Sequence, residues 1–109
     1  MIKKENRLSG KRIVGKVISK GSSFRTEFFS CRILPSRSQS VRMTVVVSKK
    51  VSPQAVVRNK IKRRVREAFD NQIGSACGRL IVVFPNRLSL EAPFDKLQEE
   101  AKKCLETRQ

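Results

Sequence analysis

The side chains best suited to chemistry in this sequence lie close together, between positions 58 and 66. Most of these positions carry a basic or amide side chain: Arg58, Asn59, Lys60, Lys62, Arg63, Arg64 and Arg66. Arginine offers planar bidentate donors to phosphate, and asparagine offers a donor and an acceptor to a base edge or sugar. No acid occurs between Pro53 and Arg66, so salt bridges between residues four apart are unavailable inside this segment, and Glu67 and Asp70 come only after it. The segment predicts a phosphate-binding surface; the alternative is a solvated basic face.

Helical spacing would hold these side chains in a fixed array. Apolar residues recur at that spacing and form one stripe able to pack on a sheet: Val57, Ile61, Val65 and Phe69. Polar residues project away from the stripe, except that Arg58 sits beside it at the first turn. We call the following set the cationic ridge: Arg58, Asn59, Lys60, Lys62, Arg63 and Arg66.

The overall charge points to the same kind of partner. The 109 residues hold 25 Lys and Arg against 9 Asp and Glu, a formal net charge of +16. All of this excess falls before position 67, where Glu5 and Glu27 are the only acids. Solubility of a small domain needs a net charge of only about 2–8. We therefore expect the partner to be a polyanion, most simply a nucleic acid.

Other kinds of site are poorly supported. Cys31, Cys77 and Cys104 lack the paired spacing of a zinc site, and histidine is absent. No glycine-rich phosphate loop or nucleophile elbow occurs, so we expect no catalytic site and no metal held by the protein. The odd cysteine count favours a reducing compartment. Without a signal peptide or a membrane-length apolar run, we expect a cytoplasmic protein with no membrane contact.

Hydrophobic periodicity predicts the elements that position the ridge. In chain order they are a helix over 11–20, extended chain over 24–34, a strand over 41–47, a helix from Ser52-Pro53 to about Asn71, a strand over 80–84 and a helix from Phe94 to Leu105. We expect the strand over 41–47 to pair antiparallel with the extended chain before it. Leu80 to Phe84 is apolar throughout, which is typical of a strand covered on both faces.

These elements indicate an α+β fold, an α/β sandwich in the order α-β-β-β-α-β-α with helices packed on a central mixed sheet. The length fits one domain over 1–109. We expect residues 1–10 to form a flexible basic N-terminal arm.

The ridge and its neighbours also resemble a known family. Ser48-Lys49-Lys50, followed after a short gap by the segment from Ala55 to Phe69, is similar to the signature of the bacterial ribonuclease P protein component. The family pattern is Arg-Asn-Arg, one residue, Lys-Arg, two residues and a further Arg. This chain has Lys60 where the family has its second arginine, which keeps the charge but loses the fork geometry.

The resemblance implies a fold and a function. The fold would be ribosomal protein S5 domain 2-like, with a left-handed βαβ crossover. The protein would be a non-catalytic subunit of ribonuclease P, an endoribonuclease, with ribonuclease P RNA and precursor tRNA as partners and no obligate protein partner. The RNA, using magnesium, would remove the 5′ leader. The RNA-binding residues would be the cationic ridge together with Lys49 and Lys50.

The resemblance also implies a cleft for the 5′ leader between the first helix and the sheet. The corresponding positions in this chain are Arg7, Lys11, Val14, Ile18 and Cys31. The family commonly has aromatic side chains in this cleft, whereas Val14, Ile18 and Cys31 are not aromatic, and the chain has no Tyr or Trp. Stacking of a base on an aromatic ring is worth roughly 1–3 kcal/mol. We therefore expect charge and aliphatic contact to hold the leader here.

Other functions remain open at this point. A small basic ribosomal protein, or a general structured-RNA-binding protein without a processing role, would have similar composition. A DNA-binding module could place the basic helix in a major groove, although no helix-turn-helix pair is recognisable. A stand-alone nuclease is the least supported, because no catalytic carboxylate or histidine cluster is evident.

Overall fold

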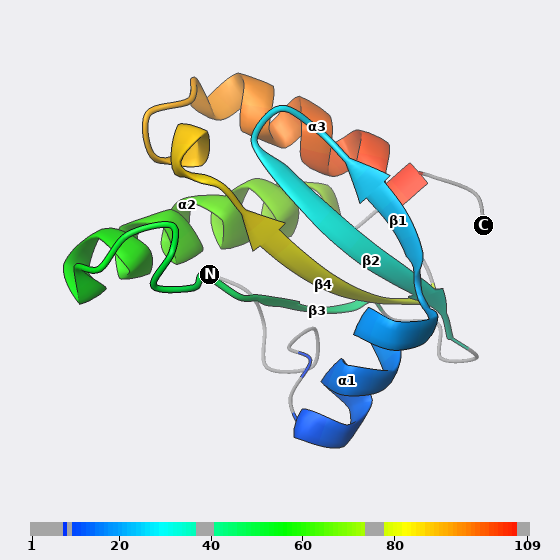
Figure 1. Ribbon diagram of the computed structural model, residues 1–109. Helices are drawn as coiled ribbons and strands as arrows, with labels where there is room; N and C mark the ends of the chain where they lie inside the picture. Colours follow the sequence, from blue (N-terminus) through cyan, green and yellow to red (C-terminus); the bar gives the residue numbers. More distant parts are fainter. Residues whose placement is uncertain (1–7, 9, 37–40, 74–77, 107–109) are drawn as a thin grey trace.

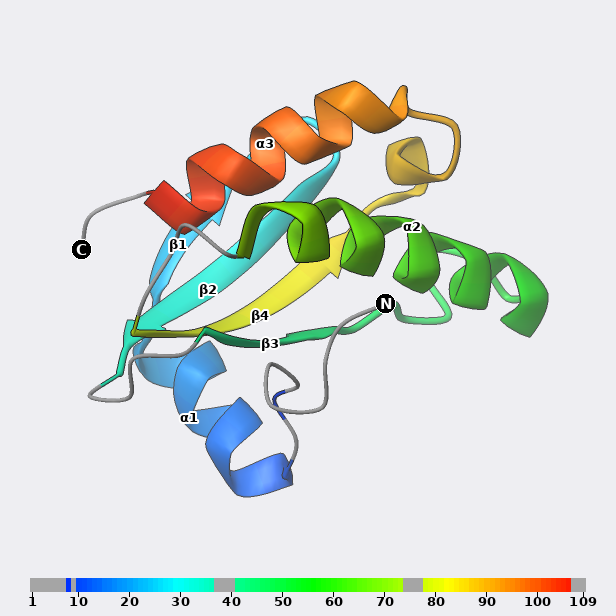
Figure 2. The ribbon, with the colours of Figure 1, turned by 180° about the vertical axis from the view of Figure 1, so that it is seen from behind.

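The fold is a mixed sheet covered by helices on both faces (Figure 1). The computed structural model describes residues 8, 10–36, 41–73 and 78–106. One helix, α1 (Lys11–Lys20), lies on one face, whereas α2 (Ala55–Ile73) and α3 (Phe94–Glu106) lie on the other (Figure 2). The strands are β1 (Ser22–Arg25), β2 (Phe29–Pro35), β3 (Arg42–Val45) and β4 (Arg79–Pro85). The predicted α+β order is confirmed, with a short 3₁₀ turn, η2 (Arg87–Leu90), added before α3.

The order of the strands corrects one expectation. Along the sheet it is β1-β2-β4-β3, so β4 lies between β2 and β3 and those two strands do not pair (Figure 1). β2 and β4 are antiparallel, whereas β3 and β4 are parallel and are connected through α2. The predicted antiparallel pairing of β3 with β2 is therefore wrong. The physical reason is burial: β4 is apolar on both faces and suits the centre, while Arg42 and Thr44 suit an edge.

Alternation along the strands divides the core in two. Phe29, Cys31 and Ile33 of β2 face α2 and α3, and Ile81 and Val83 of β4 join them there. On the opposite face, Val82 packs with Val17 of α1 and with Leu8. The full burial of all three β4 residues confirms the prediction that this strand is covered on both faces.

Leu8 is anchored, contrary to the prediction of a loose arm over residues 1–10. Its side chain is only 3% exposed, and its backbone N–H donates to the carbonyl of Met43 at 2.8 Å. Residues 1–7 and 9 lie outside the described residues. At Leu8 the prediction failed because a single apolar residue in a polar segment carries no periodicity.

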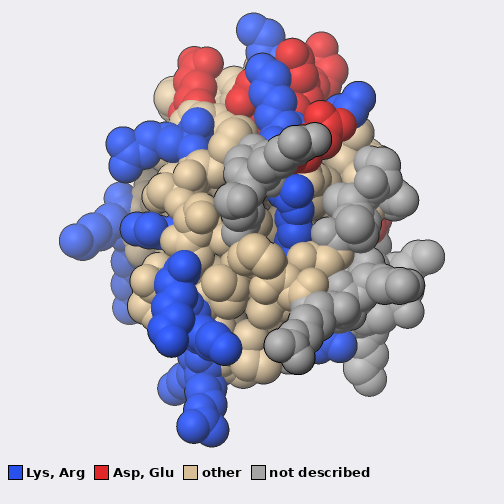
Figure 3. Space-filling view, turned by 90° about the vertical axis from the view of Figure 1, so that its right-hand side faces the viewer, with Lys and Arg blue, Asp and Glu red and all other residues tan. Residues whose placement is uncertain are grey.

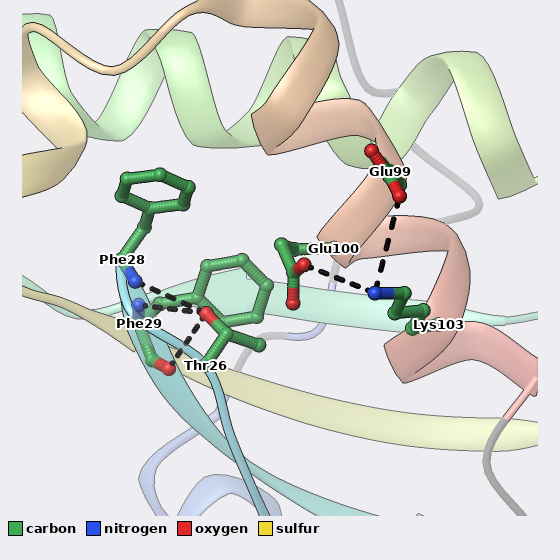
Figure 4. Close-up of polar contacts among 6 residues, drawn as sticks. All are labelled: Thr26, Phe28, Phe29, Glu99, Glu100 and Lys103. Carbon is green, nitrogen blue, oxygen red and sulfur yellow. Dashed lines mark hydrogen bonds and ion pairs between the residues drawn. The ribbon is translucent and has the colours of Figure 1, made fainter.

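A turn at Thr26 divides the predicted extended chain into β1 and β2. The Thr26 hydroxyl oxygen accepts from the backbone N–H groups of Phe28 and Phe29, at 3.1 and 3.2 Å (Figure 4). The N–H of Thr26 donates to the carbonyl of Phe29 at 2.8 Å, which closes the turn. Phe28 belongs to this turn and packs in the same core as Phe29, whereas an uninterrupted strand would place these two neighbours on opposite faces.

α1 has the predicted bounds and ends in a close approach. Gly21 follows it, and its N–H donates to the carbonyl of Val17 at 2.8 Å. Its backbone is extended, so positive φ is not what requires glycine here. A Cβ at Gly21 would lie 2.5 Å from that same carbonyl oxygen, which leaves no room for a side chain. No helix in the described ranges has the length and apolarity to cross a membrane.

Candidate nucleic-acid interface

The helix that carries the cationic ridge, α2, has its apolar side buried in the core. Ile61, Val65 and Phe69 of α2 are buried against the sheet, and the rings of Phe69 and Phe29 lie 5.5 Å apart at 55°. Val57 is half-buried against the same core. The predicted apolar stripe is therefore confirmed. Because these residues fix the rotation of α2 about its axis, the direction in which each ridge side chain projects is fixed too.

The helix begins at Ala55 rather than at the predicted Ser52-Pro53, and it continues to Ile73, past the predicted end at Asn71. Ser52 still organises the start, since its hydroxyl oxygen accepts from the N–H of Gln54 at 3.2 Å. The first backbone bond of the helix runs from the N–H of Arg58 to the carbonyl of Gln54 at 3.1 Å. Ser52 thus caps the turn before the helix instead of the helix itself.

The ridge side chains reach solvent, and carboxylates do not neutralise them. Asn59, Lys60 and Arg63 are exposed, as are Lys49 and Lys50 on the turn that leads into α2, whereas Lys62 and Arg66 are partly buried. In the part of the chain that the structure describes, no ion pair joins a carboxylate to any cation between 58 and 66. Among the described residues, the repulsion between these cations on adjacent turns is therefore not offset by a salt bridge, which favours the binding of an external anion.

The C-terminal helix shows what internal neutralisation looks like in the same molecule. On α3, the Nζ of Lys103 lies 3.3 Å from Oε1 of Glu100 and 3.9 Å from Oε1 of Glu99 (Figure 4). In Figure 3 the acidic side chains gather at the α3 end of the molecule, whereas lysine and arginine side chains extend from that end along one edge to the α1 end. The acids are thus placed away from α1.

Two arginines of α2 also have partners inside the protein. Arg58 donates to the carbonyl of Ser52 at 2.9 Å, which holds the start of the helix against the preceding turn. Arg64 donates to the carbonyls of Ser89, at 3.3 Å, and of Ala92. Arg64 therefore ties α2 to the chain between η2 and α3, a structural role consistent with its place outside the ridge. Arg58 combines a structural contact with a position at the edge of the ridge.

A shallow hollow lies along the first turns of α2. It has a volume of about 410 Å³ and is lined by Val56, Asn59, Lys60 and Arg63. Val56 is 80% exposed. Periodicity did not single out Val56, because it lies outside the apolar stripe. The hollow combines cations for phosphates with an apolar surface for a sugar or base.

The residues predicted for the leader cleft are only partly brought together. Val14 packs toward the sheet beside Val17, whereas Ile18 and Lys11 are exposed on α1. Arg7 lies outside the described residues. The placement of Cys31 in this cleft is wrong: it is 1% exposed and faces α2 and α3, on the opposite side of the sheet. Alternation from the buried Phe29 and Ile33 forces this orientation.

The sheet face beside α1 instead presents residues that had not been predicted as a site. One cross-strand row contains Arg25, Ser30 and Phe84, and the next contains Arg32, Val82 and Thr44. Arg25 is exposed, whereas Arg32, Thr44 and Phe84 are partly exposed. Phe84 packs against the small core of Leu8, Val17 and Val82, as its apolar strand predicts, and it is also partly exposed at this surface. Strand alternation could have revealed these residues once the place of β4 in the sheet was known.

The sheet with one helix on one face and two on the other, together with unneutralised cations on α2, defines a small basic α/β domain of the kind that binds nucleic acid. The family described as Ribonuclease P matches residues 2–109, so the chain belongs to the ribonuclease P protein family. Its "Ribonuclease P protein component" relative from Pseudanabaena sp. (strain PCC 6903) is 34% identical over 107 residues, 96% of this chain and 92% of the relative. The corresponding protein of Picosynechococcus sp. is 32% identical and covers 94% of this chain and 89% of its own length.

Solved structures agree with this assignment. The RNase P protein from Thermotoga maritima superposes with a TM-score of 0.79 at 31% identity, covering 91% of this chain and 94% of that one. The RNase P protein of Staphylococcus aureus gives a TM-score of 0.75 at 25% identity, covering 87% of each chain. Membership in this family assigns the chain to tRNA processing as a component of a ribonucleoprotein.

Proposed function

We propose that this chain binds the catalytic RNA of ribonuclease P through the cationic ridge and assists endonucleolytic removal of the 5′ leader from precursor tRNA. The observation that carries the proposal is the absence, among the described residues, of any carboxylate paired with the cations of positions 58–66. An RNA backbone supplies the missing counter-charge. Binding then releases the counterions condensed on that backbone, which favours association at low salt.

The ridge is suited to RNA by its geometry as well as by its charge. Lys60 and Arg63 border the hollow on α2 and would contact phosphates, while Asn59 beside them would reach a sugar or base edge. Val56 offers an apolar surface to the same nucleotides. Lys49 and Lys50 extend the basic surface along the approach to the helix. Buried anchoring of α2 means that little backbone ordering is needed when the RNA binds.

We further propose that the 5′ leader crosses the sheet face beside α1. Arg25, Arg32 and the exposed cations of α1, including Lys11, would attract its phosphates. Phe84 would supply an aromatic surface between them, so the leader site does not rely on charge and aliphatic contact alone. Val14 and Ile18 border this face from α1, and Arg7 remains a proposed contact from the N-terminal segment.

The chemistry belongs to the RNA in this proposal. Magnesium ions held by the RNA, rather than by this chain, supply the Lewis acid for phosphodiester hydrolysis. The described residues bring no three His, Cys, Asp or Glu side chains together at one point. The chain itself acts as a non-catalytic cofactor that positions the substrate, in the cytoplasm, with the RNA and precursor tRNA as partners and without an obligate protein partner.

Reconstitution tests the proposal directly. The chain is mixed with a bacterial ribonuclease P RNA at low magnesium, and cleavage of precursor tRNA is measured against the RNA alone. We expect marked stimulation, because the protein lowers electrostatic repulsion between the RNA and its substrate. Folded protein that gives no stimulation would overturn the proposal. Cosedimentation with ribosomes, in place of association with one discrete RNA, would favour the alternative of a ribosomal protein.

A further inference from the structure

Two cysteines far apart in the sequence meet in the core. Cys31 of β2 and Cys104 of α3 lie with their Sγ atoms 2.9 Å apart, although 73 positions separate them in the chain. Both are buried, at 1% and 0% exposure. Neither residue has a role in the cationic ridge or in the sheet face beside α1. Free cysteine packs well as a small apolar residue, but core packing alone does not require two sulfurs in contact.

We propose that Cys31 and Cys104 are a redox-modification site, which closes to a reversible intramolecular disulfide and fastens α3 to β2. The sulfurs would need to approach by only about 0.9 Å to reach the ~2.05 Å of a disulfide bond. β2 is held on both sides by β1 and β4, so the partner that adjusts is α3. This proposal is independent of the proposed function, because it concerns the opposite face of the sheet from the leader path.

Hydrogen peroxide is the oxidant that suits a buried pair, because it is small. The sulfur of Cys104 attacks one peroxide oxygen; an S–O bond forms, the O–O bond breaks, and the departing hydroxide takes the proton of the Cys104 thiol to leave as water. The sulfur of Cys31 then attacks the resulting sulfenic acid. An S–S bond forms, the S–O bond breaks, and the second water carries away the proton of Cys31. Two thiols are oxidised by two electrons, and one peroxide is reduced to two waters.

The position of Cys104 makes it the cysteine that reacts first. It lies in the last turn of α3, which ends at Glu106, and the ends of helices open locally more readily than strands at the centre of a sheet. Cys31 is held within the sheet. The hydrogen bond between the Cys31 thiol and the sulfur of Cys104, together with burial, raises the pKa of Cys31, which disfavours Cys31 as the first nucleophile. Oxidation should therefore be slow in the native protein and specific to this pair.

A disulfide here would stabilise the fold without changing the cationic ridge. It would close a loop that includes most of the chain, and long closed loops restrict the unfolded state most. We expect the unfolding midpoint to rise by on the order of 10 °C. RNA affinity should stay at the level of the reduced protein, because the apolar footing of α2 is already in place before the bond forms.

The experiment uses the full chain with Cys77→Ser, which removes the third cysteine, a residue outside the described ranges. After treatment with hydrogen peroxide, we expect the mass to fall by about 2 Da, for two lost hydrogens, and a non-reducing peptide map to join Cys31 to Cys104. Dithiothreitol should restore both thiols. Thermal unfolding followed by far-UV circular dichroism should then show the higher midpoint for the oxidised form.

One further variant and the wild-type chain keep the result unambiguous. With Cys31→Ala in the same background, no intramolecular bond can form, and dimedone should trap the sulfenic acid on Cys104. Peroxide treatment that leaves both thiols free, that adds oxygen without joining the peptides, or that joins only separate molecules would overturn the proposal. An oxidised form that unfolds at the same or a lower temperature would contradict the proposal that the disulfide stabilises the packing of α3 on β2. The wild-type chain provides a check that does not depend on any substitution, since its three thiols should fall to one.

Discussion

Neutralising part of the cationic ridge should reduce the salt dependence of RNA binding by a calculable amount. The change is the triple variant Lys60→Gln, Lys62→Gln and Arg63→Gln, whose side chains have no ion-pair partner among the described residues. The slope of log K against log salt is negative, and each lost phosphate contact reduces its magnitude by about 0.7–0.9. Three lost contacts therefore reduce it by about 2–2.7. Between about 50 and 200 mM salt, the variant should therefore lose about 20- to 40-fold less affinity than the native chain.

The assay is a binding titration with a bacterial ribonuclease P RNA at several concentrations of monovalent salt and constant magnesium. The matched control is Lys96→Gln, Lys102→Gln and Lys103→Gln on α3, which removes the same formal charge. Lys103 is already paired with Glu99 and Glu100, so its removal changes the local charge less. Equal slopes for the two triple variants would refute the reasoning, because net charge rather than the ridge would then govern binding. Equal unfolding midpoints of the two variants and the native chain would show that neither change acts through stability.

Three further predictions concern stability and the leader path. Gly21→Ala should destabilise the protein by about 1–3 kcal/mol, because the new Cβ would lie 2.5 Å from a carbonyl oxygen. Gly15→Ala should instead stabilise α1 by about 0.5–1 kcal/mol, because nothing lies within 4 Å of the new Cβ. Denaturant melts that rank the two variants in the opposite order would contradict this account. Arg64→Ala should lower the free energy of unfolding by about 1–3 kcal/mol while leaving the salt slope for RNA unchanged; a reduced slope would place Arg64 in the interface. Phe84→Leu keeps apolar volume but removes the aromatic face, so affinity for precursor tRNA should fall about fivefold or more, with no change for mature tRNA. Equal losses of affinity for both RNAs would show that Phe84 does not contact the leader.

Local patterns in the sequence correctly predicted the bounds of α1 and the apolar stripe of α2. The bounds of α1 agree with the prediction because apolar residues at helical spacing and Gly21 are both signals within one short segment. The footing of α2 on Ile61, Val65 and Phe69 follows from the same spacing. Predicting the ridge required no more than the position of cations relative to that stripe and the absence of nearby acids.

Predictions that needed long-range pairing were less successful. The place of β4 between β2 and β3 depends on which apolar strand is buried most deeply, and that is a property of the whole sheet. Cys31 was assigned to the wrong face because its position in the family pattern was used without the alternation set by Phe29 and Ile33. Phe84 packs against the core as expected, but its partial exposure was not predicted, because an apolar run does not show which of its residues will be covered completely.

The sequence by itself determined that this is one small basic domain with a helix of unneutralised cations, because charge, periodicity and the spacing of acids can be counted along the chain. Only the tertiary structure decided which side chains share a surface with Phe84, that Leu8 is tied to Met43, and that Cys31 meets Cys104. Those relations join residues distant in sequence, and they arise when burial of a common core selects one pairing of strands over the others that the same local patterns allow.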